Sequence, residues 1–179
     1  MATLEQVILV DPKDSVVGVE EKLKAHRLGL LHRAFSVFIY RETENGIEFL
    51  LQKRHPAKYH SGGLWANACC GHPRPQEEIA EGATRRLFEE LSIKVPLKVL
   101  GSFIYRAEFE NGLIEHELDY VLIGECEFGS SFSADPEEIA ECRWLSVSAL
   151  EEELNSFPHH FTPWFKPALT VVLEKTCKF

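Results

Sequence analysis

The chain combines one long segment of helical periodicity with several short segments of β-type pattern. In residues 77–92 an apolar side chain recurs every four positions, at Ile79, Ala83, Leu87 and Leu91. This spacing places the four side chains along one side of an α-helix. Charged residues occupy most of the remaining positions, so the pattern predicts an amphipathic helix over residues 77–92.

Segments rich in β-branched and aromatic residues predict strands on both sides of this helix. They are QVILVD, SVVGVEE, HRAFSVFIY, GIEFLLQKR, VLGSFIYRAEF, LIEHELDYVLIGECEF and AECRWLSV. Asn-Gly pairs at residues 45–46 and 111–112 favour tight turns, so two of the connections are predicted to be hairpins. Residues 55–63, HPAKYHSGG, are predicted to form a loop because proline and paired glycines interrupt regular structure.

Two further helices are expected near the C-terminus. SALEEELN predicts a short one, and Pro163 predicts the start of the last, because proline favours the first helical turn. No internal repeat or linker is evident, so residues 1–179 are expected to form one α/β domain with a mixed sheet.

Composition narrows the possible functions. The 179 residues are 45% hydrophobic, which is enough for one ordinary core. The formal net charge of −9 argues against broad nucleic-acid binding, which depends on Lys and Arg neutralising phosphates. No apolar run approaches the ~20 residues of a membrane span. The N-terminal residues lack the pattern of a signal peptide, so a cytoplasmic location with reduced thiols is expected for the five cysteines.

The segment NACCGHPRPQEE places a thiol and an imidazole two residues apart. If it is extended, Cys70 and His72 share a face while Cys69 points away into the core. Structural zinc, a disulfide, an acyl-transfer nucleophile and a proton-transfer acid are the chemical alternatives. A four-thiolate zinc site has no support, because the chain contains no CxxC pair.

Carboxylates gather at two places. The predicted central helix carries several glutamates, near the cations Lys53, Arg54 and Lys58. This combination is typical of a magnesium–diphosphate site, but it also fits a solvated helix face with i,i+4 ion pairs. Glu115 and Glu117 lie two apart in a predicted strand and share one face, which fits either a metal site or an exposed edge.

One spacing resembles a known signature, the Nudix box of enzymes that act on diphosphates. The matching positions are Gly71, Glu77, Arg85, Leu87, Glu89, Glu90 and Ile93. Arg86 stands where the box has a glutamate, and Ser92 where it has a glycine. The resemblance implies a Nudix-type α/β/α sandwich, while the missing helix carboxylate argues against the usual hydrolysis.

Four further motifs, NACCGHP, LLHRAFSVF, YRAEFENGLIEHE and FTPWF, together resemble the type I isopentenyl-diphosphate isomerases of the Nudix superfamily. The resemblance extends from about Val7 to the last helix. It implies conversion of isopentenyl diphosphate into dimethylallyl diphosphate by a metal-dependent allylic proton shift. The implied partner is a small-molecule diphosphate, and neither nucleic acid nor a membrane is expected as a partner. The protein itself is expected to be a monomer or a weak homodimer.

The resemblance also implies the roles of individual residues. Cys70 and Glu117 would form the acid–base pair on opposite faces of the substrate. Tyr105 would hydrogen-bond the carboxylate of Glu117, and the ring of Trp164 would stabilise a carbocation. The implied phosphate-binding residues are Lys22, Arg54, Lys58 and Arg86.

Two metal sites follow from the same resemblance. Glu90 would hold Mg²⁺ together with the diphosphate. The second site would use His26, His32, His72, Glu115 and Glu117, with Cys70 also counted among the metal-contacting residues. Its mixed nitrogen and oxygen donors suit Mn²⁺ or Zn²⁺. The remaining histidines, His55, His60, His116, His159 and His160, are expected in loops or on the surface.

Two other functions remain open from the sequence. The first is a true Nudix hydrolase of nucleoside diphosphate derivatives, in which Arg86 and the Cys70 motif would have no role. The second is a catalytically silent metal-binding module that uses the fold for partner interaction.

Overall fold

The computed structural model describes residues 5–127 and 129–176, so Cys177 lies outside the described residues. The strands are β1 (Gln6–Val10), β2 (Val16–Glu21), β3 (His32–Thr43), β4 (Gly46–Arg54), β5 (Trp65–Ala66), β6 (Cys69–Gly71), β7 (Lys98–Glu108), β8 (Ile114–Glu125) and β9 (Ile139–Ser146). The helices are α1 (Lys22–Leu28), α2 (Ile79–Leu91), α3 (Val147–Ser156), α4 (Phe165–Lys175) and the 3₁₀ turn η1 (Pro158–His160).

Strand β3 organises the sheet. Along one edge it pairs in parallel with β8, from His32 opposite Glu117 to Tyr40 opposite Glu125. Its other edge pairs antiparallel with β1, β6 and β4 at successive positions. The hairpins β3–β4 and β7–β8 form across the two Asn-Gly turns as predicted. The sheet is therefore mixed, with one parallel pair among antiparallel ones.

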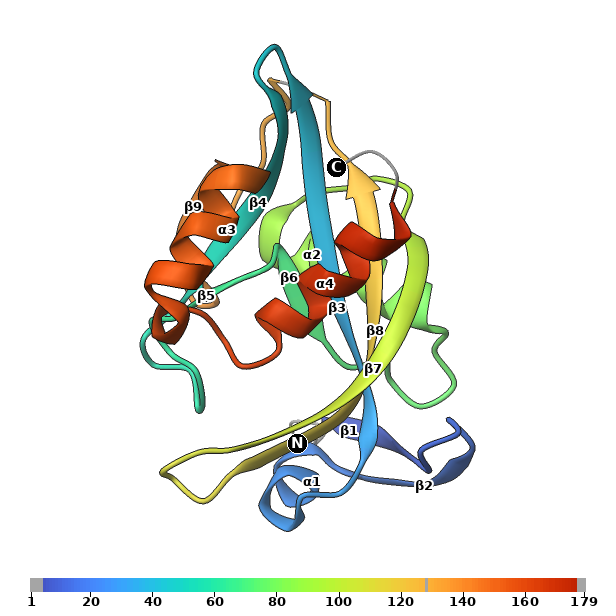
Figure 1. Cartoon of the computed structure of the whole chain (residues 1–179). Coiled ribbons are helices and arrows are strands. Elements are labelled where there is room, and N and C mark those ends of the chain that lie inside the picture. The colour runs from blue at the N-terminus through green and yellow to red at the C-terminus, as the bar shows by residue number, and fades with distance from the viewer. Residues whose placement is uncertain (1–4, 128, 177–179) are drawn as a thin grey trace.

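Helices cover both faces of this sheet (Figure 1). Successive β3 side chains point to opposite faces. Val37 packs in a core cluster with Leu87 of α2, whereas Phe38 packs in a separate cluster with Leu150 of α3 and Phe165 of α4. The α/β/α sandwich expected from the sequence is confirmed.

Most element boundaries agree with the hydrophobic pattern. The central helix begins at Ile79, because Glu78 and Glu81 form a capping box, and ends where Ser92 adopts a left-handed conformation. Helix α4 begins at Phe165, two residues later than the position of Pro163 indicates. Helix α1 was not predicted, because its seven residues carry no apolar stripe. It ends at Gly29, whose φ of 62° favours glycine.

One face of the sheet changes character along β3. Near its C-terminal end this face carries Phe38 and contributes to the core beneath α3 and α4. Near its N-terminal end it carries His32 and Ser36, both buried, next to the carboxylates of β8. A face that is apolar at one end and polar and buried at the other identifies the polar end as the candidate site.

Candidate active site

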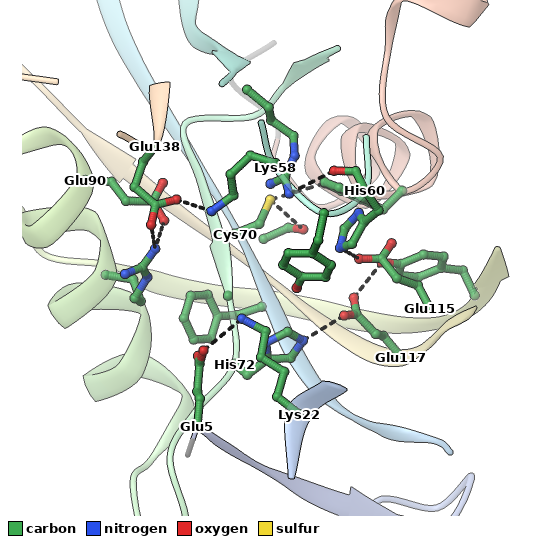
Figure 2. Close-up of a pocket in the computed structure, with 18 residues that line it drawn as sticks. Glu5, Lys22, Lys58, His60, Cys70, His72, Glu90, Glu115, Glu117 and Glu138 are labelled. Carbon is green, nitrogen blue, oxygen red and sulfur yellow. Dashed lines mark hydrogen bonds and ion pairs between the residues drawn. The ribbon is translucent and has the colours of Figure 1, made fainter. Parts of the chain in front are cut away.

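A cavity of about 310 Å³ opens at this polar end (Figure 2). Its walls bring together residues that are up to 159 positions apart in the chain, from Glu5 to Trp164. They include Lys22, Arg54, Lys58, His60, Cys70, His72, Arg86, Glu90, Tyr105, Glu115, Glu117, Glu138 and Trp164. In Figure 2, Glu90 and Glu138 lie on one side of Cys70, while Glu115, Glu117 and His60 lie on the other. The cavity therefore contains two separate groups of carboxylates with a thiol between them.

Three histidines and Glu117 form the first group of possible metal ligands. One ligand atom from each of His26, His32, His72 and Glu117 lies within 4.8 Å of all the others. His26 donates from Nδ1 to the Lys22 carbonyl at 2.7 Å, and His32 donates from Nδ1 to the Leu30 carbonyl at 2.8 Å. Because these bonds occupy Nδ1, both rings have only Nε2 left for a ligand.

The polar atoms of this group fit a cation. His26 Nε2 is buried and has no hydrogen-bond partner among residues 5–127 and 129–176, a costly arrangement unless another group satisfies it. His32 Nε2 lies 3.3 Å from His72 Nε2, so two imidazole nitrogens converge on one place. Converging imidazole nitrogens with a carboxylate are a donor set typical of first-row transition metals and zinc.

Tyr105 connects the two carboxylates of β8. Its hydroxyl lies 3.0 Å from Oε2 of Glu115 and 2.5 Å from Oε2 of Glu117. Glu117 Oε1 also accepts a hydrogen bond from His72 Nε2 at 2.8 Å. Both carboxylates face the cavity as the spacing predicted, and His116 between them points away and bonds the Gly29 carbonyl.

The two carboxylates differ in their proton affinity before a cation binds. Burial would raise the pKa of Glu117, but hydrogen bonds from His32 and His72 outweigh burial and hold this pKa well below its usual range. Burial and the adjacent charge of Glu117 raise the pKa of Glu115 well above its usual range. Burial lowers the pKa of His26 to about 4 and that of His72 to about 3. Neutral imidazoles are the form that binds a metal ion.

His60 was expected to be a loop or surface residue, and its place in a loop agrees with that expectation. It lies in the loop between β4 and β5 but is only 6% exposed. Its Nε2 lies 2.8 Å from Oε1 of Glu115. With His26 and Glu115 it forms a second group of ligand atoms within 4.8 Å of one another. Nothing in the local sequence indicated this position, because it results from how the loop packs against β8.

Cys70 lies on β6 and its thiol is held by three polar side chains. Trp164 Nε1 is 3.2 Å from the sulfur, and Ser36 Oγ is 3.8 Å from it. The thiol donates to Asn67 Oδ1 at 3.2 Å. Burial and the nearby charge of Asp119 raise the pKa of Cys70, so the thiol is protonated. The sulfur belongs to neither group of metal-ligand atoms formed by the described residues.

The short strand β6 confirms the predicted extended conformation. Cys69 is fully buried, while Cys70 and His72 face the cavity. Since β6 and β8 pair with opposite edges of β3, Cys70 and Glu117 flank β3 on the face of the sheet that lines the cavity.

Three supporting residues were not predicted. Asn67 and Ser36 contact the thiol, and Asp119 accepts from Ser36 Oγ at 2.8 Å. A signal for Asp119 was present, because it continues the same-face series that begins with Glu115 and Glu117. Asn67 opens the cysteine motif, but its amide contacts depend on the fold.

Basic side chains line the cavity at several places, each next to a carboxylate or an aromatic ring. Lys22 pairs with Glu5 at 2.9 Å, and Lys58 pairs with Glu138. Arg54 lies over the Trp164 ring, 5.4 Å from its centroid. All four predicted phosphate-binding side chains therefore line one cavity. Lys53, in contrast, lies over the Trp65 ring and is absent from the cavity wall.

Arg86 lies among the second group of carboxylates, which includes Glu90 and Glu138. The guanidinium pairs with Glu90, with Glu89 at 2.9 Å and with Glu138 at 3.5 Å. Glu90 is 4% exposed, and Gln52 also donates to it at 3.1 Å. Burial raises the pKa of Glu90, although the charge of Arg86 opposes this rise. Glu138 was not predicted as a site residue, because the loop that carries it has no motif of its own.

Comparisons with known proteins identify the family. Residues 30–165 match the NUDIX domain family. An "Isopentenyl-diphosphate Delta-isomerase" of Photobacterium profundum is 49% identical over 96% of both chains. The chain belongs to the isopentenyl-diphosphate Delta-isomerase family. A protein of the same name from Burkholderia multivorans is 45% identical over 90% of this chain and 89% of its own.

Solved structures confirm the Nudix fold at much lower identity. DR0079 from Deinococcus radiodurans matches with a TM-score of 0.70 and 21% identity, over 94% of this chain and 98% of that protein. The NUDIX domain of Shewanella oneidensis NrtR, complexed with ADP ribose, matches with a TM-score of 0.63 and 12% identity over 92% of both chains. Membership of the isomerase family thus confirms the resemblance seen in the cysteine, histidine and glutamate motifs. Among the described residues, no helix is long and apolar enough to cross a bilayer.

Proposed function

We propose that this enzyme converts isopentenyl diphosphate into dimethylallyl diphosphate, with Cys70 and Glu117 as its acid–base pair. The arrangement of these two groups is the observation that carries the proposal. They enter one cavity from opposite edges of β3, and the cations of the same cavity lie where a diphosphate can reach them. The proposed 1,3-proton shift uses one group that adds a proton and a second group that removes one.

Substrate and product are isomers, so the reaction adds one proton and removes another. One of the two groups adds a proton to the terminal alkene carbon, C4, and leaves a tertiary carbocation at C3. The other group removes a proton from C2, and the electrons of that C–H bond form the new double bond. The acid ends deprotonated and the base protonated, so exchange with solvent restores both and introduces solvent hydrogen into the product.

Two aromatic residues support this reaction. Trp164 is 3% exposed, and its ring lines the cavity next to the Cys70 thiol. The negative face of an indole stabilises a nearby cation by about 2 kcal/mol or more in a desolvated site. Tyr105 holds Glu117 through its hydroxyl and so orients the carboxylate toward the reacting carbon.

The rest of the cavity binds the diphosphate and its cations. Lys22, Arg54, Lys58 and Arg86 would pair with the phosphate oxygens, since ammonium and guanidinium groups bind phosphate through charge-assisted hydrogen bonds. Glu90 would hold Mg²⁺ beside them. His26, His32, His72, Glu115 and Glu117 would hold Mn²⁺ or Zn²⁺, which when bound supplies positive charge that compensates the paired carboxylates.

Proton NMR in D₂O tests the proposal directly. Purified protein is incubated with isopentenyl diphosphate and Mg²⁺, with and without added Mn²⁺. We expect dimethylallyl diphosphate that carries solvent deuterium, and no product from Cys70→Ala or Glu117→Gln. His159→Ala is a matched control, because His159 is exposed and lies outside the cavity.

The same reactions distinguish the proposed isomerase from the two alternative functions. Release of inorganic phosphate would identify a Nudix hydrolase instead. Stoichiometric metal without turnover would identify a silent binding module. Full activity in both variants would refute the assigned acid–base pair while leaving the isomerase reaction in place.

A further inference from the structure

We infer that His60 is a positioning residue, which holds Glu115 in place for the metal ion of the His/Glu site. The inference rests on the proposed function, since it assumes that a divalent cation binds there. It adds a role for a fourth histidine, supplied by the loop between β4 and β5.

The ring of His60 is fixed on several sides by aromatic side chains. It stacks on Phe109, with 4.9 Å between ring centroids and 23° between ring planes. The edge of Trp164 approaches it at 6.0 Å and 84°. The ring of His26 is nearly parallel to it, with 6.1 Å between centroids and 21° between planes. A ring enclosed in this way has little rotational freedom, so its nitrogens point in defined directions.

The loop that carries His60 is itself attached to the β7–β8 hairpin. Asn111, in the hairpin turn, donates from Nδ2 to the Tyr59 carbonyl at 2.6 Å. Arg54 donates to the His60 carbonyl at 3.4 Å. The backbone on both sides of the imidazole is therefore tied to neighbouring elements, and His60 meets Glu115 through this docking.

The hydrogen bonds of His60 fit a neutral imidazole that donates from Nε2. The Ser61 hydroxyl lies 3.4 Å from Nδ1 and can donate to it, which leaves the proton on Nε2. Nε2 then donates to Glu115 Oε1 at 2.8 Å. Tyr105 lies on the other oxygen, Oε2, at 3.0 Å. Both oxygens of Glu115 are thereby held in one orientation, and each retains a lone pair for a cation.

A comparison with His26 separates a positioning residue from a ligand. His26 has one ring nitrogen bonded to a carbonyl and one buried nitrogen without a partner among the described residues. His60 has contacts at both of its ring nitrogens. The free nitrogen of His26, together with its place in the four-residue group of possible ligands, fits a ligand. His60 is outside that group, and its nitrogens contact Ser61 and Glu115, which fits a residue that orients a ligand. Loss of such a hydrogen-bond partner typically weakens metal affinity about 10–100-fold.

The test measures Mn²⁺ and Co²⁺ affinity by chelator competition in wild type, His60→Ala and His60→Gln. We expect affinity to fall about 10–100-fold in His60→Ala. The Gln side chain should restore it to within about threefold, because its amide N–H can donate to Glu115 from a position similar to that of Nε2. His159→Ala is the control. If circular dichroism shows that His60→Ala is unfolded, His60→Leu replaces it, since leucine fills the space beside Phe109 without a donor.

A double-mutant cycle asks whether His60 acts through Glu115. In the Glu115→Gln background, His60→Ala should cause no further loss of affinity, because the carboxylate that it orients is gone. Equal losses in both backgrounds would overturn the inference. So would unchanged affinity in His60→Ala, which would make His60 a packing residue.

Two remaining outcomes are also decisive. Loss of affinity in both His60→Ala and His60→Gln, with a changed Co²⁺ absorption spectrum, would make His60 a ligand and refute the positioning role. If wild type bound neither metal, the cation of the proposed function and the role of His60 would fail together. A wild type that binds metal and a His60→Ala variant of equal affinity would refute the role of His60 alone.

Discussion

Replacing Tyr105 by phenylalanine tests the hydrogen bonding of the two carboxylates with a minimal change in shape. The substitution removes one buried hydroxyl, which lies 2.5 Å from Glu117 and 3.0 Å from Glu115. The ring remains, so its contacts with Phe103 and Trp164 are kept. The effect therefore isolates the hydroxyl from the packing of the side chain.

The magnitude follows from the charge of the acceptor. A hydrogen bond to a charged group contributes a net ~1.5–3 kcal/mol. Because 1.36 kcal/mol corresponds to a factor of ten in rate, loss of the bond that orients Glu117 should lower kcat by about 10–150-fold. Among the described residues the Tyr105 hydroxyl bonds only Glu115 and Glu117 and none of the phosphate-binding side chains, so KM for isopentenyl diphosphate should change by less than about threefold.

The assay is initial-rate formation of dimethylallyl diphosphate at saturating Mg²⁺ and Mn²⁺, with metal content measured in the same samples. Phe103→Leu is a suitable control, because it changes a neighbouring ring without removing a polar group. A kcat for Tyr105→Phe within about threefold of wild type would refute the argument that this hydroxyl orients the carboxylate. A large loss of bound metal would show instead that the hydroxyl acts on the metal site.

Three further predictions concern other parts of the cavity. Lys58→Ala should raise KM for the diphosphate by about 10–100-fold, with a smaller effect on kcat, because a phosphate-binding cation is removed. Steady-state kinetics at two salt concentrations will measure this effect. An unchanged KM would contradict the assignment of Lys58. Gly62→Ala should displace the loop between β4 and β5 and raise KM, because a Cβ at this position would lie 2.5 Å from the Pro56 carbonyl oxygen. Gly18→Ala is the control and should be neutral, because its Cβ would meet only a side-chain atom at 3.9 Å. Equal kinetics in the two variants would contradict the prediction. Burial would lower the pKa of His32, but its hydrogen bond to the Glu117 carboxylate outweighs burial and raises this pKa above 6.5. Because protonated His32 must lose its proton before it binds a metal ion, metal affinity should still increase with pH above 6.5. A constant affinity in Mn²⁺ titrations from pH 6 to 8.5 would exclude this coupling.

The local elements could be predicted because their signals are periodic. The four-residue repeat of the central helix and the Asn-Gly turns depend only on nearby residues, and both agree with the structure. The shared face of Glu115 and Glu117 follows from the two-residue period of a strand. Helix α1 was missed because seven residues without an apolar stripe give no such signal.

Those parts of the site that lie within one sequence motif could be predicted. Cys70 and His72 are close in sequence, and an extended backbone is enough to place them on one face. Their meeting with Glu117 depends on β6 and β8 pairing with opposite edges of β3, which is a property of the sheet. The ring contacts of His26 with His32 and His72 likewise arise only when α1, β3 and the segment after β6 come together.

The sequence by itself determined the family, the order of most helices and strands, and the residue types available for proton transfer and cation binding. Only the tertiary structure decided that His60 is buried against Glu115 and that Ser36 and Asn67 hold the Cys70 thiol. The physical reason is that backbone periodicity is a local property of the chain. The burial and hydrogen bonding of a loop side chain, in contrast, depend on which distant elements the sheet brings next to it.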